Sequence, residues 1–312
     1  LDDAITMFRR ASQLDSSPKI VAANLDRACH LRECDRAADR PEEMPTLPVS
    51  DAERESGELQ AESLALGSKL FNKHGVLLIE NAFDPELIRA CDDYFVREYE
   101  SYFRDTSHAD ALRIGDKRFQ ITVALDGPIN SPNLYANPFV MGLMKQLLGA
   151  KFFLGCTVCA ASLPGSKDQH LHKDHRALFT KNADDPPIQT PPFAITLMIP
   201  LVPLDEMSGT TTVRKGSHLV SRRESPDLPR QVPIVSVGSC FLMDLRLSHQ
   251  GLGNKTDRVR PIFNFVYQQP WFADNKNFQK QPPLRIPAPQ FERIPEELRS
   301  LFAWATQPGA DI

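Results

Sequence analysis

Hydrophobic positions follow two different rhythms on either side of about residue 150. Before this point, apolar residues recur at intervals of three and four, a spacing typical of amphipathic helices. Asp84 followed by Pro85 is a helix-start signal, because aspartate caps free backbone N–H groups and proline suits the first turn. The pattern predicts helices over residues 59–73, 84–103 and 138–148, with strands over residues 75–81 and 118–125.

From residue 151 onward the chain consists of short apolar runs separated by turns rich in glycine and proline. Such a series, without helices of ordinary length between the runs, favours a β-sandwich or jelly roll over an α/β sheet. The predicted strands cover residues 151–163, 170–179, 193–202, 210–213, 234–243 and 259–268. The expected fold class is therefore mainly β with flanking helices, preceded by a short helical N-terminal segment.

The first fifty residues have a pattern of their own. Ala4, Phe8, Ala11 and Leu14 are spaced as in the second helix of a tetratricopeptide repeat, and residues 20–29 resemble the start of the next repeat. The acidic, proline-containing stretch from about residue 35 to residue 56 is typical of a linker. We therefore expect residues 1–50 to end a tetratricopeptide-repeat region that binds a protein partner, and residues 51–312 to form the main domain.

Composition and charge exclude several classes of function. A net charge of −4 gives no electrostatic basis for binding nucleic acid, and no run of about eighteen apolar residues predicts a membrane span. Six cysteines in 312 residues are not typical of a disulfide framework, so a cytoplasmic location is expected. Cys156 and Cys159 form a C-x-x-C pair inside a predicted buried strand, where cysteine behaves as a small hydrophobic residue more often than as a metal ligand.

The densest group of metal-ligand residue types runs from Gln169 to His175. Because side chains alternate between the faces of a strand, His172 and Asp174 would point to the same side and could bind one metal ion. His170 shares that face. The spacing alone therefore leaves two pairs open, His170 with His172 or His172 with Asp174.

Two further segments complete a recognisable series of motifs. Lys215 to His218 forms a Lys-Gly-Ser-His turn, and His249 is followed by Gly251, Asn254 and, eleven residues on, Arg260. This order of H-x-D motif, Gly-Ser-His turn and distal histidine strongly resembles the phytanoyl-CoA dioxygenase-like family of iron(II)/2-oxoglutarate oxygenases, over roughly residues 65–270. Lys215 departs from the family, because many members have proline at this position.

The resemblance implies a metal site and a co-substrate site. His172, Asp174 and His249 are the implied ligands of iron(II), which leaves open positions for 2-oxoglutarate and dioxygen. The distal carboxylate of 2-oxoglutarate needs an arginine fork, whose two parallel hydrogen bonds lysine cannot match. Strand periodicity leaves both Arg258 and Arg260 open, and the family spacing selects Arg260.

Three more residues are candidates for co-substrate contacts. In the family, the strand that precedes the H-x-D motif contributes such contacts, which makes Gln120 and Thr122 candidates. Gln169, three residues before His172, is a candidate for orienting a ligand.

The resemblance also implies the fold and the reaction. The fold is a double-stranded β-helix, the cupin-like jelly roll, with helices on the outer face of one sheet and iron in its mouth. The implied reaction hydroxylates an unactivated C–H bond of a small or carrier-tethered organic molecule and releases succinate and carbon dioxide. Asp174 favours this outcome over halogenation, because related halogenases have alanine or glycine there. Desaturation or cyclisation of a natural-product intermediate is the alternative within this chemistry, and a non-catalytic cupin-like binding module is the alternative outside it.

Overall fold

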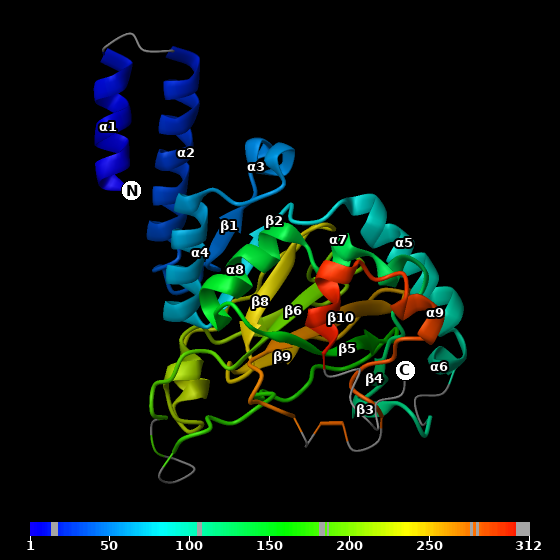
Figure 1. The fold of residues 1–312 in the computed structure, drawn as a ribbon. Coiled ribbons are helices and arrows are strands. Elements are labelled where there is room, and N and C mark those ends of the chain that lie inside the picture. Colours follow the sequence, from blue (N-terminus) through cyan, green and yellow to red (C-terminus); the bar gives the residue numbers. More distant parts are fainter. Residues whose placement is uncertain are drawn as a thin grey trace.

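The computed structural model describes residues 1–13, 18–104, 108–180, 185, 187–274, 277–278 and 281–303. Its centre is an eight-stranded sheet in the order β1-β2-β8-β6-β10-β5-β4-β3 (Figure 1). In that order, the strands are Thr46–Pro48, Val76–Glu80, Cys240–Asp244, Ala194–Pro200, Arg260–Gln268, Phe153–Ser162, Arg118–Thr122 and Leu112–Gly115. Every neighbouring pair is antiparallel except β1 with β2.

A second, smaller sheet pairs β7 (Thr211–Val213) with β9 (His249–Gly251). Side chains from both sheets meet in one apolar cluster, which includes Val213 of β7 and Ile262 of β10. The mainly β fold predicted from the sequence is therefore confirmed, and the space between the two sheets is the interior of the fold.

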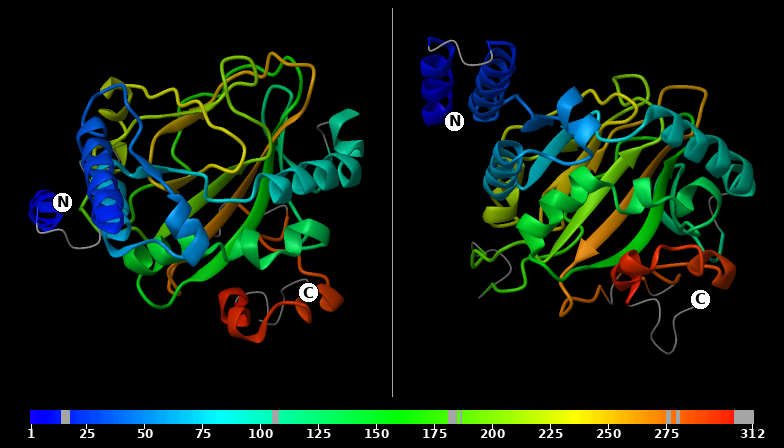
Figure 2. Two further views of the ribbon diagram at one scale, coloured as in Figure 1. Left: turned by 90° about the horizontal axis from the view of Figure 1, so that it is seen from above. Right: turned by 45° about the horizontal axis from the view of Figure 1, so that its top comes forward.

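Helices such as α4, α5 and α8 cover the outer face of the large sheet, whereas α1 and part of α2 project away from it (Figures 1 and 2). Phe263, Phe265 and Tyr267 alternate along β10 and are buried against the helices, each contributing roughly 1.5–3 kcal/mol by leaving water. The intervening residues of β10 face the interior. The helices are α1 (Asp2–Gln13), α2 (Pro18–Ala37), α3 (Asp51–Ser56), α4 (Ala61–His74), α5 (Pro85–Glu98), α6 (Ser101–Arg104), α7 (Pro132–Tyr135), α8 (Pro138–Leu148) and α9 (Ala288–Phe291), with 3-10 helices η1 (Gly127–Asn130), η2 (Ser217–Leu219), η3 (Ser225–Asp227) and η4 (Glu296–Phe302).

Helix ends follow the local sequence signals closely. Asp84 caps α5 by accepting a hydrogen bond from the Glu86 N–H at 2.9 Å, and α8 spans the predicted residues. The helix predicted over residues 84–103 is divided in two, because α5 ends at Glu98 and α6 begins at Ser101. Among the described helices, none is both long and apolar enough to cross a membrane.

Two predictions about the chain's organisation are corrected. The stretch interpreted as a linker contains β1, which pairs with β2 and buries Leu47 in the core, so the sheet already begins at Thr46. Residues 170–179, which the structure describes, do not form the predicted strand. Within this segment only His172 forms a β-bridge, and its partner is His249. Backbone N–H groups there bond to the facing segment at residues 169, 172 and 175, every third position, which a regular strand cannot do.

Candidate metal centre

A cavity of about 800 Å³ lies between the two sheets. Its floor is the inner face of β4, β5, β6 and β10, and its other side is formed by β7, β9 and the segment 169–174. The sequence brings these parts together from positions more than 150 residues apart, from Arg118 on β4 to Asn277 beyond β10. The predicted site residues gather in and around this cavity.

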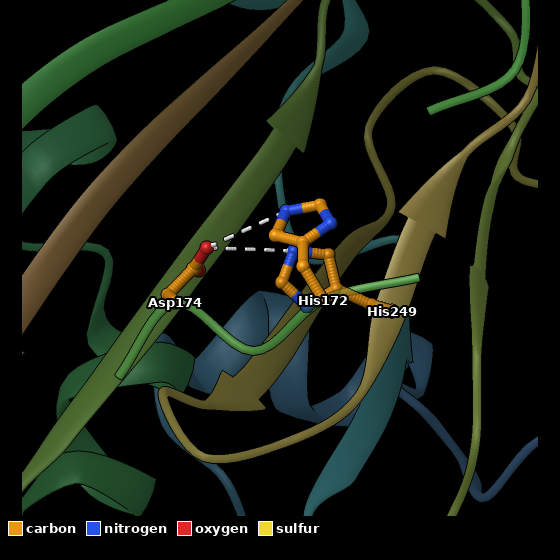
Figure 3. Close-up of side chains that lie close together, drawn as sticks. All are labelled: His172, Asp174 and His249. Atoms are coloured by element: carbon orange, nitrogen blue, oxygen red, sulfur yellow. Dashed lines mark ion pairs between the residues drawn. The ribbon is translucent and has the colours of Figure 1, made fainter. Parts of the chain in front are cut away.

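His172, Asp174 and His249 form a cluster whose ligand atoms all lie within 4.8 Å of one another. The Asp174 Oδ1 atom is 3.8 Å from His172 Nε2 and 3.6 Å from His249 Nε2. Figure 3 shows this carboxylate facing both imidazoles. His170 lines the cavity but lies outside the cluster, so the structure brings together the second of the two pairs left open by the sequence.

Backbone contacts orient both imidazoles. His172 and His249 exchange backbone hydrogen bonds of 3.0 and 2.8 Å, which holds the two segments side by side. Each ring donates its Nδ1–H to the carbonyl two residues earlier, His172 to His170 at 2.9 Å and His249 to Leu247 at 3.1 Å. Because a carbonyl only accepts, Nδ1 carries the proton and Nε2 keeps its lone pair toward the cluster.

The cluster is partly shielded from water. The exposed fractions of the side chains are 25% for His172, 36% for Asp174 and 9% for His249. Burial lowers the pKa of His172, and the neighbouring imidazole of His249 lowers it further. Both effects favour the neutral imidazole, the form that can bind a metal ion.

Three residues form a row across the floor of the cavity, which we call the arginine row. In the sheet, Ser162 of β5 lies directly opposite Arg118 of β4 on one side and opposite Arg260 of β10 on the other. Residues in register on neighbouring strands point to the same face, so two guanidinium groups flank one hydroxyl. Arg118 and Arg260 are 2% and 3% exposed.

The arginine row makes its hydrogen bonds to a hydroxyl and to backbone carbonyls, and Asp168 is the acidic residue that acts on Arg118 from a distance. Arg260 Nη2 donates to Ser162 Oγ at 2.7 Å and its Nη1 to the Gly209 carbonyl at 2.6 Å, while Arg118 also donates to Ser162 Oγ. Among the described residues, no carboxylate forms an ion pair with either guanidinium, and Arg260 Nε has no hydrogen-bond partner. Burial lowers the pKa of Arg260 to about 9 and that of Arg118 to about 10. An anion placed here would relieve this unfavourable arrangement.

Of the other residues predicted to contact the co-substrate, some line the cavity and others do not. Arg258 lies before β10 with its side chain 72% exposed and near Asp92, so only Arg260 reaches the cavity. Gln120 lines the cavity. Thr122 does not line the cavity. Its hydroxyl donates to the Pro282 carbonyl at 2.5 Å, and its backbone N–H donates to the Gln281 side chain. The predicted contact between Thr122 and the co-substrate is therefore not supported.

Gln169 holds two walls of the cavity together. Its Nε2 donates to the Ile114 carbonyl at 3.0 Å, and its Oε1 accepts from the Gly251 N–H at 3.1 Å. A Cβ atom at Gly251 would lie 2.6 Å from that Oε1 and 3.0 Å from Arg118 Nη1, so a larger residue there would push the Gln169 side chain out of this position. Gln169 therefore links β9, which carries His249, to β3.

Sequence reasoning missed Arg118 and Ser162. The signal for Arg118 was available, because it is two residues before Gln120 on the same predicted strand and shares its face. Nothing local distinguishes Ser162, whose position depends on the pairing of three strands. Cys156 lines the cavity while Cys159 packs on the helix side, so the C-x-x-C pair does not converge on one point.

The turn that the sequence analysis singled out supports both ligand segments. Ser217 Oγ accepts from the Ser248 N–H at 2.7 Å, next to His249. Lys173, between His172 and Asp174, donates to the Ser217 carbonyl at 2.6 Å. His218 is buried and contacts the Asn72 carbonyl at 3.2 Å, so it braces this turn and lies outside the metal-ligand cluster.

Comparison with known proteins gives one family match. The family described as "Phytanoyl-CoA dioxygenase (PhyH)" matches residues 71–262, which includes the cluster and Arg260. The dioxygenase peniF of Penicillium patulum is 31% identical over 220 residues, which cover 63% of this chain and 69% of that protein. The match does not reach α1 and α2, so the tetratricopeptide interpretation stays a prediction.

Two solved structures share the fold. The epimerase SnoN from nogalamycin biosynthesis, described in complex with Fe3+, alpha ketoglutarate and nogalamycin RO, superposes with a TM-score of 0.53 at 18% identity, covering 72% of this chain and 94% of its own. The carbocyclase SnoK from the same pathway has a TM-score of 0.51 at 17% identity, covering 68% and 84%. The predicted jelly-roll architecture is confirmed by this likeness.

Proposed function

The chain belongs to the phytanoyl-CoA dioxygenase family, and we propose that it hydroxylates an unactivated C–H bond of a small organic molecule, using iron(II), 2-oxoglutarate and dioxygen and releasing succinate and carbon dioxide. The observation that carries this proposal is the arginine row beside the His172, Asp174 and His249 cluster. A metal-binding cluster alone is compatible with a simple binding module. A buried pair of guanidinium groups without an ion-paired carboxylate among the described residues favours an anion in the same cavity as well.

The cluster fits iron(II). Two neutral imidazoles and one carboxylate on one side of the ion are the ligand set typical of non-haem iron oxygenases. His172, Asp174 and His249 would supply these ligands, and their Nδ1 hydrogen bonds already select the correct tautomer for both histidines. Asp174 retains the carboxylate that related halogenases lack, which supports hydroxylation over halogenation.

The arginine row fits the distal carboxylate of 2-oxoglutarate. Arg260 and Arg118 would each donate to it, and Ser162 has a hydroxyl hydrogen left to donate because its oxygen already accepts from both arginines. Deep burial makes these interactions stronger than they would be in water. Gln120, which lines the cavity between this row and the rest of the floor, would contact the bound co-substrate.

The protein's own residues would bind and orient the metal and 2-oxoglutarate, and these bound groups would supply the oxidising power. Iron(II) with 2-oxoglutarate and dioxygen provides the oxidant for the C–H bond. Arg260 and Arg118 fix the co-substrate at one end, while the cluster fixes the metal at the other. The burial of Arg118 and Arg260 would keep water from the far end of the bound co-substrate.

Succinate formation from 2-oxoglutarate, with iron(II) and without added substrate, tests the proposal. The unaltered protein should form succinate slowly. Arg260→Ala should raise the 2-oxoglutarate concentration needed by about ten- to a hundredfold, because a charged hydrogen-bonded pair is worth about 1.5–3 kcal/mol. Arg258→Ala is the matched control, since that side chain is exposed, and it should leave the requirement unchanged. Absence of succinate from the unaltered protein would favour the non-catalytic binding module.

Product analysis separates hydroxylation from the alternatives in the same chemistry. Hydroxylation adds one oxygen atom to the substrate, whereas desaturation removes two hydrogen atoms and adds none. Mass spectrometry of products made under labelled dioxygen distinguishes these outcomes. Incorporation of no labelled oxygen into a converted substrate would replace hydroxylation by desaturation or cyclisation.

A further inference from the structure

The cavity extends well beyond the part that a co-substrate would fill. Arg260, Ile262, Asn264 and Val266 follow one another along its floor on β10. Since a strand rises about 3.4 Å per residue, Val266 is roughly 20 Å from Arg260. A five-carbon dicarboxylate held by the arginine row is much shorter than this distance. The far part of the floor is therefore available for another molecule.

We call this far part the trough and define it by six residues in two rows. In the first row, Asn264 of β10 lies between Val158 of β5 and Met198 of β6, and in the second, Val266 lies between Cys156 and Thr196. Residues in register share a face, so all six point into the cavity that they line. Three neighbouring strands thus form a continuous surface.

The chemistry of the trough differs from that of the arginine row. None of its six residues carries a charge at neutral pH, and Val158, Met198 and Val266 offer only apolar surface. The two polar side chains are neutral and largely uncommitted. Thr196 is 3% exposed and its Oγ1 has no hydrogen-bond partner among the described residues, while Asn264 Nδ2 reaches the Ile262 carbonyl only at 3.5 Å. A buried hydroxyl without a partner is unfavourable, so a ligand that hydrogen-bonds to it binds more tightly.

A packed apolar cluster borders one end of the trough. Val266 packs against a cluster of Phe193, Ala194, Leu245 and Phe272. Trp271 lies beside this cluster, with its ring 6.3 Å from that of Phe193, and is 64% exposed. This end of the trough is therefore bordered by apolar residues, with an exposed aromatic side chain beside them.

None of the described cationic side chains that line the cavity lies in the trough. Arg118 and Arg260 belong to the arginine row at the opposite end. Lys173 is held by the carbonyls of Ser217 and Val220 at 2.6 and 3.3 Å. Arg113 is exposed on β3, which is at the far edge of the sheet from β6. A phosphate-bearing carrier arm would therefore find no described cation in the trough.

We propose that the trough binds an uncharged, mainly apolar substrate with a hydroxyl or carbonyl group that hydrogen-bonds to Thr196 and Asn264. Thr196 is then a specificity-determining residue, because it selects which part of the molecule faces the metal cluster. This proposal rests on the proposed function, since it assigns the near part of the cavity to iron(II) and 2-oxoglutarate. It favours a free small molecule over a carrier-tethered one.

Binding of Nile red, an uncharged and mainly apolar fluorescent dye with one carbonyl group, tests the proposal. The protein is loaded with Ni(II) and 2-oxoglutarate, so that the near part is filled without turnover, and titrated with the dye. We expect saturable binding of one dye molecule that octanoyl-CoA, an anionic carrier-tethered competitor, does not displace. Val266→Asp should weaken binding more than tenfold, because it places a carboxylate in the trough.

Thr196→Val removes the hydroxyl at nearly constant shape and should weaken binding about two- to tenfold, the worth of one hydrogen bond. Ile234→Asp is the matched control, because Ile234 is 75% exposed and outside the cavity lining, and it should bind the dye as the unaltered protein does. Thermal unfolding checks that each variant is folded. If the Val266→Asp protein does not fold, the dye affinity of the Thr196→Val protein alone tests the proposal.

Three results would overturn the proposal: no saturable dye binding, equal binding by both trough variants and the unaltered protein, or displacement by octanoyl-CoA below the dye's own concentration. The last result would assign the trough to a carrier-tethered substrate. Failure of the proposed function shows itself elsewhere, as absence of succinate formation from 2-oxoglutarate in the unaltered protein. Dye binding does not depend on that reaction, so the two failures are distinguishable.

Discussion

Replacing Lys215 by methionine should loosen the N-terminal segment from the main domain. The Lys215 ammonium group donates to three backbone carbonyls beyond the end of α2. These are the carbonyls of Ala38 at 2.6 Å, of Glu43 at 3.0 Å and of Arg40. Methionine keeps the apolar length of the side chain and removes only the donors, so the variant isolates these contacts.

The expected loss follows from which carbonyls water can reach. Arg40 and Glu43 are exposed, so water replaces the ammonium group there at little cost. Ala38 is fully buried, and its carbonyl would lose its bond to the ammonium group. An unsatisfied buried acceptor costs about 1–3 kcal/mol, so we expect the free energy of unfolding to fall by about this amount.

Urea denaturation measures this change, with Lys145→Met as the matched control. Lys145 is an exposed lysine on α8, and its replacement should change the free energy of unfolding by less than about 0.5 kcal/mol. Limited proteolysis should also cut the Lys215→Met protein more readily between residues 38 and 45. Equal stability of the two variants would refute the reasoning, because it would show that the three carbonyl contacts contribute nothing net.

Four further outcomes are expected. His172→Ala should abolish stoichiometric iron(II) binding in equilibrium dialysis while His170→Ala retains it, and the reverse result would move the metal ligand by two residues. Arg118→Gln should raise the 2-oxoglutarate concentration for half-maximal succinate formation about ten- to a hundredfold, and an unchanged value would remove Arg118 from the site. Burial lowers the pKa of His74 from 6.5 to about 4, so the unfolded chain takes up a proton first and stability falls by up to about 3 kcal/mol as the pH falls from 6.5 to 4. His74→Gln should flatten that decline in urea titrations at several pH values. A chain that starts at Ser56 lacks β1 and the acceptors of Lys215 and should unfold at a markedly lower temperature, whereas an unchanged transition would support the predicted boundary at residue 50.

Local sequence signals determined the start of α5 and the fold class of this protein. Asp84 and Pro85 specify the start of α5 because a side-chain cap and a fixed φ act within one turn. The change from helical spacing to short apolar runs near residue 150 specified a mainly β domain, since both periodicities are properties of neighbouring residues. The cluster was also accessible from the sequence, because the spacing of His172, Asp174 and His249 matched a family.

Tertiary structure decided what local patterns leave open. Residues 170–179 read as a strand, yet only His172 finds a bridging partner, because strand formation depends on the segment opposite. Residues 46–48 read as linker, yet Leu47 is buried once β2 lies beside it. Pairing across the sheet also placed Arg118 and Ser162 beside Arg260 and excluded Thr122 from the cavity. Backbone pairing between distant segments sets these positions, and no single stretch of sequence contains both partners of such a pair.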